Sequence, residues 1–125
     1  MLHERHYTIE QASAARPWVS ARLERMRDAV ARLDDDEARA ALERIESSDG
    51  GSFPGREVAE ALLEFHAALS ELEQLEVVVR DLERGLVDFP AIRDSEEVYL
   101  CWVEGESEIG FWHRPDAGFA GRQPL

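Results

Sequence analysis

The sequence predicts an α+β fold that is mostly helical, with a long, coiled-coil-like antiparallel helical hairpin followed by a small C-terminal antiparallel β-hairpin or sheet. Through the first two-thirds of the 125 residues, apolar positions recur at alternating spacings of three and four, as in packed helices. In residues 85–125, the predicted β region and tail, the period changes to that of strands around a turn at Gly105. The length favours a single domain over residues 1–125.

The first helical arm is predicted over residues 8–47. Thr8 and Gln11 have the spacing of a capping box, which marks a helix start. Pro17 predicts a kink, because proline removes a backbone hydrogen bond from a helix. The acidic run 34–37 allows either a break capped by an aspartate or a continuing helix. The seam of this arm consists of Ile9, Ala12, Arg16, Val19, Leu23, Met26, Val30 and Leu33.

A flexible loop is predicted over residues 48–55 and a second helical arm over residues 56–84. The loop is rich in Ser, Gly and Pro, which do not sustain a helix. Gly85 is expected to end the second arm as its C′ residue. Each helix buries only one stripe, so the pair needs a further surface, either the C-terminal region or a second copy of the chain. The seam of the second arm consists of Val58, Leu62, Phe65, Leu69, Leu72, Glu76 and Val79.

Residues 96–113 are predicted to form the two strands of a β-hairpin. A loop with an even number of residues pairs Leu100 with Phe111 and is favoured. A three-residue loop would shift the pairing by one and place Tyr99 beside His113. Both faces are rich in apolar side chains under either register, so both must be covered. The helices cover one face, and the tail or a second subunit is expected to cover the other.

The net charge of the chain limits the classes of partner that it is expected to bind. The chain has 27 acidic residues and 14 basic residues, all of them arginine, for a net charge of −13. A field of that sign repels phosphate backbones and anionic lipid, so neither a nucleic-acid nor a membrane partner is expected. A single cysteine, Cys101, fits a reducing compartment, and no signal-peptide or membrane-spanning run is present. We therefore expect a cytoplasmic protein. Because the helices need a further surface, we also expect a homodimer or another homo-oligomer, and a protein partner is possible.

Candidate site residues gather in the C-terminal region. In one interpretation, His113 beside a carboxylate acts as a general base while Arg122 clamps an anionic substrate. The favoured interpretation is structural: Arg122 pairs with Asp88 or Asp116 and pins the terminus, and Phe119 fills the core. The candidate binding residues are Asp88, Trp102, Trp112, His113, Asp116, Phe119 and Arg122.

Metal and thiol chemistry is weakly indicated. In the favoured register, Cys101 and His113 point to opposite faces of the hairpin, which argues against a catalytic pair. No CxxC or HxxxH spacing occurs, so a metal with four protein ligands is not expected. A weaker His/carboxylate metal site at His113, Asp116 and Asp88 stays open. No cofactor is predicted.

The C-terminal 45 residues resemble the signature of an uncharacterised bacterial family, domain of unknown function 2203. The matching blocks are GLVDFP (85–90), VYLCW (98–102), GE (105–106), WH (112–113) and DAGFAGR (116–122). The segment YTIEQASAARPWV (7–19) is similar to that family's opening helix. The resemblance implies paired helices with a small β region, and it implies no activity.

Two functions follow as hypotheses. The first is a non-enzymatic, self-associating protein-interaction module, which the aromatic and arginine content of the C-terminal region favours. The alternative is a small enzyme, or a protein that binds a small molecule or a metal, with a site built around His113, Asp116, Arg122 and Asp88.

Overall fold

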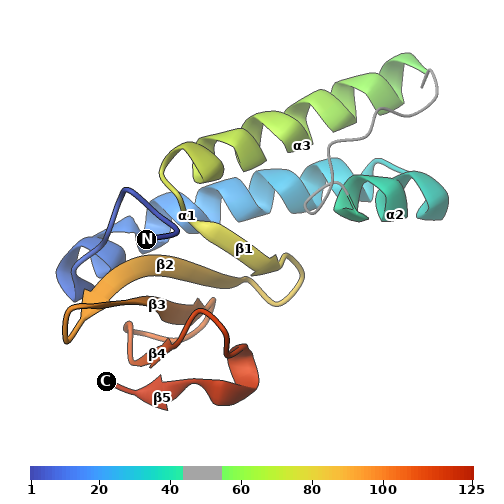
Figure 1. Ribbon diagram of the computed structural model, residues 1–125. Helices are drawn as coiled ribbons and strands as arrows, with labels where there is room; N and C mark the ends of the chain where they lie inside the picture. The colour runs from blue at the N-terminus through green and yellow to red at the C-terminus, as the bar shows by residue number, and fades with distance from the viewer. Residues whose placement is uncertain (44–54) are drawn as a thin grey trace.

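The computed structural model describes residues 1–43 and 55–125 and shows an α+β fold (Figure 1). Within these residues, three α-helices lie on one side of a five-stranded antiparallel sheet, which is larger than the predicted hairpin. The α+β class is therefore confirmed. The end of the predicted first arm, residues 44–47, and nearly all of the predicted loop lie outside the described residues.

The first helix, α1 (Ile9–Ala31), begins as predicted. Thr8 is its N-cap, and the reciprocal bonds between Thr8 and Gln11 complete the capping box. The helix continues through Pro17, which has no N–H to donate to the carbonyl of Ser13. The Arg16 Nε donates to that carbonyl instead, at 3.1 Å. The side chain of Arg16 thus satisfies the acceptor that Pro17 leaves free.

The acidic run breaks the first arm. The second helix, α2 (Asp35–Glu43), starts after a gap of three residues, and Asp34 lies just before it. The Asp34 Oδ1 accepts from the amide of Glu37 at 2.8 Å, and the Glu37 Oε1 accepts from the amide of Asp34 at 3.0 Å. Of the two alternatives that the sequence left open, the capped break is the one observed.

The third helix, α3 (Arg56–Gln74), lies antiparallel beside α1 (Figure 1). Arg25 on α1 bonds Glu64 at 2.7 Å and Glu71 at 2.8 Å, both on α3. The apolar side chains between the two helices are fully buried: Ala12, Val19, Leu23, Met26, Phe65, Ala68 and Leu72. These contacts pair the helices; a coiled-coil geometry is not confirmed.

The predicted second arm, 56–84, is wrong beyond residue 74. Glu76 adopts the left-handed conformation, with φ of 57°, and ends the helix in a Schellman motif. The amide of Val77 donates to the carbonyl of Leu72 at 3.0 Å, and that of Glu76 donates to Glu73 at 2.9 Å. A glycine usually takes this position because it has no Cβ. The glycine expected there, Gly85, has φ of 68° in the turn between the first two strands.

The sheet is a meander in which each strand pairs with the next along the chain. A single 3-10 turn, η1 (Phe119–Gly121), precedes the last strand. The strands are β1 (Val78–Asp81), β2 (Leu86–Arg93), β3 (Glu96–Val103), β4 (Phe111–His113) and β5 (Gln123–Pro124).

The favoured register of the predicted hairpin is wrong by one residue. Tyr99 pairs with His113, and Cys101 pairs with Phe111. The connection between β3 and β4 is irregular and is held from outside the hairpin, since Arg16 on α1 donates to the carbonyl of Ser107. Because a slip by one residue exchanges the two faces of a strand, Cys101 and His113 share a face after all.

The two faces of the sheet differ in what covers them. The face toward the helices belongs to the main apolar core and carries Val79, Val87, Phe89, Ala91, Val98, Leu100, Trp102 and Trp112. The other face carries Arg80, Leu86, Asp88, Tyr99, Cys101, Phe111 and His113. The tail covers part of this face, as predicted, through Arg122, whose guanidinium lies 3.8 Å from the ring centre of Phe111.

The N-terminal segment covers another part of the same face. The His3 Nε2 lies 2.7 Å from the Tyr99 hydroxyl. β1 pairs only with the first half of β2, up to Asp88. Beyond it, the amide of Tyr7 donates to the carbonyl of Pro90 at 2.7 Å. The sequence did not predict this cover. In the described parts of the chain, none of the helices has the length and apolar character needed to span a membrane.

Candidate functional site

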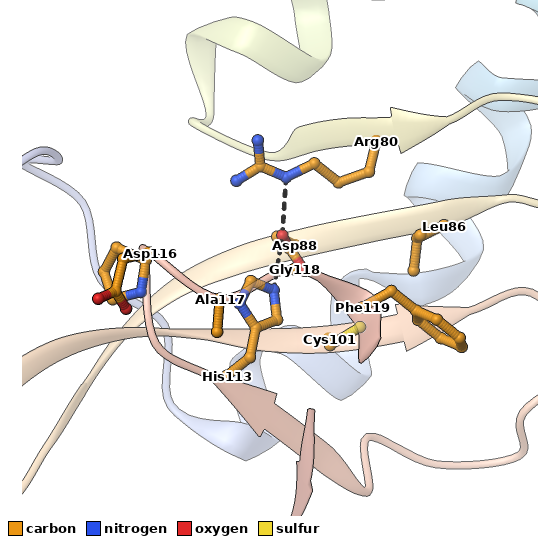
Figure 2. Close-up of a pocket in the computed structure, with 10 residues that line it drawn as sticks. Arg80, Leu86, Asp88, Cys101, His113, Asp116, Ala117, Gly118 and Phe119 are labelled. Atoms are coloured by element: carbon orange, nitrogen blue, oxygen red, sulfur yellow. Dashed lines mark hydrogen bonds and ion pairs between the residues drawn. The ribbon is translucent and has the colours of Figure 1, made fainter. Parts of the chain in front are cut away.

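Asp88, Cys101 and His113 come together on the sheet face opposite the helices. Asp88 on β2 pairs directly with Cys101 on β3, and His113 lies on the next strand, β4. The ligand atoms of the three side chains all lie within 4.8 Å of one another, and all three residues are buried. Figure 2 shows Asp88 between Arg80 and His113, with Cys101 on the neighbouring strand. We call these three residues the triad.

The two carboxylate oxygens of Asp88 differ in their hydrogen-bond contacts. Its Oδ2 accepts from the Arg80 Nε at 2.8 Å and lies 2.9 Å from the His113 Nε2. Its Oδ1 is buried and has no hydrogen-bond partner among the residues that the structure describes. Buried acceptors are almost always satisfied, so an unsatisfied carboxylate oxygen beside two other ligand atoms needs an explanation.

The hydrogen bonds of His113 show that its Nδ1 carries a proton. The Nδ1 lies 2.8 Å from the backbone carbonyl of Arg114, which only accepts, so Nδ1 carries a proton. The Nε2 faces the Oδ2 of Asp88, and one proton must lie between those two atoms for the contact to be attractive. That proton belongs either to an imidazolium or to a carboxylic acid.

Cys101 is a protonated thiol at neutral pH. Burial raises the pKa of its thiol to about 11, the charge of Asp88 adds to the rise, and Arg122, 3.9 Å from the sulfur, offsets it only in part. Both ring nitrogens of His113 already have other partners, so the histidine is not positioned to take the thiol proton. This geometry gives no activated cysteine nucleophile.

A cavity of about 320 Å³ opens beside the triad. The tail forms part of the cavity wall, and Figure 2 shows Arg80 on the other side of Asp88 from His113. Asp116 is exposed, and Phe119 is 37% exposed. The lining residues are Arg80, Leu86, Asp88, Cys101, His113, Pro115, Asp116, Ala117, Gly118 and Phe119.

The structure separates the predicted site residues into three groups. Asp88, His113 and Asp116, three of the four residues of the second functional hypothesis, line one cavity together with Phe119. Arg122 lies beside Cys101 and pins the terminus. Trp102 and Trp112 lie on the opposite face of the sheet, in the core against the helices.

Two structural expectations for the tail need correction. Arg122 pairs with Glu106, at 2.8 Å and 3.3 Å, and with neither Asp88 nor Asp116. Burial alone would raise the pKa of Glu106, but the bonds from Arg122 and from the amide of Val103 lower it. Phe119 does not fill the core, because arginines stack on its ring at the surface: Arg84 at 4.7 Å and Arg122 at 4.5 Å.

Sequence reasoning missed Cys101 and Arg80 as members of the site. The signal for Cys101 was present in the alternative register, which puts residues 99, 101, 111 and 113 on one face. Arg80 gave no such signal, because the helical seam appeared to continue through it. Its position depends on β1, a strand of only four residues.

Comparison with known proteins gives one match. No curated protein and no solved structure matches the chain. The family model described as "Uncharacterized conserved protein (DUF2203)" matches residues 5–125. This match covers nearly the whole chain and agrees with the resemblance drawn from the C-terminal blocks. The chain therefore belongs to the DUF2203 family of uncharacterised conserved proteins.

Proposed function

We propose that this protein binds a divalent transition-metal ion of the zinc type through the triad of Asp88, Cys101 and His113. Imidazole nitrogen, thiolate sulfur and carboxylate oxygen are the three donor types that zinc takes in proteins. A soft thiolate in the set disfavours magnesium and calcium, which prefer oxygen ligands alone. The proposal replaces the expectation of a site at His113 and Asp116, because Asp116 is exposed while Cys101 is buried beside His113.

The observation that carries the proposal is the unsatisfied Oδ1 of Asp88. The side chain is 1% exposed, and Oδ1 has no partner within the described residues. A buried carboxylate oxygen without a partner costs about 1–3 kcal/mol or more. A metal ion held by Oδ1, the Cys101 Sγ and the His113 Nε2 would remove that cost.

The contacts around the triad also suit metal ligands. A histidine that binds a metal through one nitrogen usually donates the other N–H to a carbonyl or a carboxylate, as His113 does to the carbonyl of Arg114. Ligating carboxylates are themselves held by hydrogen bonds, and Arg80 holds the Oδ2 of Asp88. The ion would take the place of the proton between His113 and Asp88, and that proton would leave.

The spacing of the triad is close to what zinc requires. Two ligand atoms of a tetrahedral zinc ion lie about 3.3–3.8 Å apart, since zinc–ligand bonds measure about 2.0–2.3 Å. The triad atoms lie within 4.8 Å of one another, so contraction by about 1.5 Å at most closes the site. The ion would bind Cys101 as the thiolate, and the thiol proton would pass to solvent as the metal–sulfur bond forms.

Zinc titration of the purified protein, followed by calorimetry and by competition with a chelator, tests the proposal. We expect one ion per chain for the wild type. Cys101→Ser and Asp88→Asn each keep the size of the side chain but remove a charged ligand, so each should weaken zinc binding by at least about 100-fold.

The matched control is His66→Gln, which removes a histidine of α3 outside the site and should leave the affinity unchanged. Co²⁺ provides a second reading, because a cobalt–thiolate bond gives a charge-transfer absorption that Cys101→Ser abolishes. Zinc binding that is equally tight in the wild type and in both ligand variants would refute the proposal.

A further inference from the structure

The cavity beside the triad has the chemistry of a ligand site. We infer that the fourth coordination position of the ion opens into this cavity and binds an organic carboxylate. This inference rests on the proposed metal site. The carboxylate lies between the metal and Arg80, and the apolar body of the ligand lies against Phe119. This inference goes beyond metal binding because it assigns the class of molecule that the loaded site recognises.

Three protein ligands leave a tetrahedral zinc ion with one open position. Sites of that composition are the ones that bind water or a small molecule at zinc. All three triad residues line the cavity, so the open position faces space rather than packed side chains. The volume of about 320 Å³ is at the small end of the range for ligand pockets.

The charge around the cavity favours an anion once the metal is bound. Arg80 lines it, while Arg84 and Arg122 contact lining residues, Arg84 stacked on Phe119 and Arg122 beside Cys101. Three carboxylates, those of Asp88, Glu106 and Asp116, balance them. A divalent ion adds two positive charges, and the thiolate of Cys101 cancels one. The carboxylate of Asp88 cancels the other, so the metal centre is neutral, and Arg80 supplies the positive charge beside its open position.

Arg80 has donors available for a carboxylate. Its Nε uses one of the five N–H donors of a guanidinium on Asp88, and its side chain is 43% exposed. The terminal nitrogens form a planar fork, which matches the two oxygens of a carboxylate. Arg80 lines the cavity and holds Asp88 through its Nε. In Figure 2 its two terminal nitrogens point away from Cys101 and His113, so the guanidinium turns toward the cavity to bind a ligand carboxylate.

The remaining walls favour an organic carboxylate over phosphate. Leu86, Pro115, Ala117 and Phe119 give the cavity an apolar side, on which a hydrocarbon or aromatic body can lie. The exposed carboxylate of Asp116 at the rim repels an ion with two negative charges more than one with a single charge. Free phosphate lacks an apolar body and carries the higher charge, so the ligand class is a monocarboxylate.

Titration of the Co²⁺-loaded protein with benzoate, acetate and inorganic phosphate tests the inference through the d–d absorption of the ion. Each variant is measured at a Co²⁺ concentration that saturates it. We expect benzoate to change the spectrum at lower concentration than acetate, and phosphate to bind more weakly than benzoate. Arg80→Gln should weaken benzoate binding about 10-fold or more, because it removes a charge-assisted, bidentate contact.

Phe119→Ala separates the apolar contact from the charge. It should weaken benzoate binding several-fold and leave acetate binding nearly unchanged, because only benzoate reaches the ring. The control Arg39→Gln removes an arginine of α2 that is 71% exposed and should change neither value.

The outcomes distinguish this inference from the metal site beneath it. The ligand assignment is overturned if Co²⁺ binds without a spectral response to benzoate, or if Arg80→Gln and Phe119→Ala bind benzoate as tightly as the wild type. The metal site stands in either case. Tighter binding of phosphate than of benzoate also overturns the assignment. Failure of the wild type to bind Co²⁺ overturns both proposals.

Discussion

At the scale of single residues, two glutamates hold the N-terminal segment against the rest of the chain. Glu97 accepts from the amides of Leu2 at 2.7 Å and His3 at 3.0 Å and lies 2.8 Å from the His6 Nε2. Burial alone would raise the pKa of Glu97, but these hydrogen bonds outweigh it and lower the pKa to about 2. Glu76 accepts from the amides of the next two residues along the segment.

The lowered pKa of Glu97 predicts a pH dependence of stability. A carboxyl whose pKa is lower in the folded chain stabilises the fold above its unfolded pKa, near 4.5, and that contribution is lost as the pH falls toward about 2. Denaturant unfolding at about pH 6 and pH 3 should therefore show a larger loss of free energy for the wild type than for Glu97→Gln. An equal loss in both proteins would show that Glu97 does not anchor the segment.

Glu76 also explains why one helix boundary was not predictable from local sequence. Val79 and Leu82 continue the three–four spacing of α3, so the apolar pattern gives no sign that the helix has ended. A left-handed C′ residue is usually glycine, and here it is a glutamate. Its side chain bonds His3 and the amides of Glu4 and Arg5, which are distant in sequence. These tertiary contacts stabilise a conformation that the local sequence disfavours.

At the scale of elements, the α+β class, the start of α1 and the strands flanking Gly105 were predictable because each has a local signal. The register between β3 and β4 was not predictable, because both faces are apolar and the pattern fits either alignment. Contacts from distant residues, such as that of Arg16 with Ser107, hold the connection. Cys101 and His113 share a face only in the observed register. The candidate site could therefore not be predicted without knowing the register between β3 and β4.

The packing of α3 against α1 predicts a contrast between two leucines of the same helix. Leu69 is 6% exposed and belongs to the core, whereas Leu63 is 70% exposed. Leu69→Ala should lower the free energy of unfolding by about 2–5 kcal/mol, because it removes buried methyl groups and leaves a cavity. Leu63→Ala should change it by no more than about 0.5 kcal/mol. Chemical denaturation measures both, and equal effects would contradict the predicted helix seam.

At the scale of the whole molecule, the two ends of the chain converge on the sheet face that carries the triad. The N-terminal segment reaches Tyr99, and Tyr99 packs against His113, with ring centres 5.5 Å apart. The tail closes the other side through Phe119 and Arg122. A second copy of the chain is therefore not required to cover this face, and the homodimer stays a prediction from the sequence, as do a protein partner and a cytoplasmic location.

X-ray diffraction from crystals grown with Zn²⁺, with anomalous data collected on both sides of the zinc absorption edge, tests the metal site most directly. The account predicts one strong anomalous peak within bonding distance of the His113 Nε2, the Cys101 Sγ and the Asp88 Oδ1. It also predicts that the present contact of 2.9 Å between His113 and Asp88 is replaced by bonds to the ion. Anomalous peaks confined to surface carboxylates and histidines, with that contact intact, would contradict it.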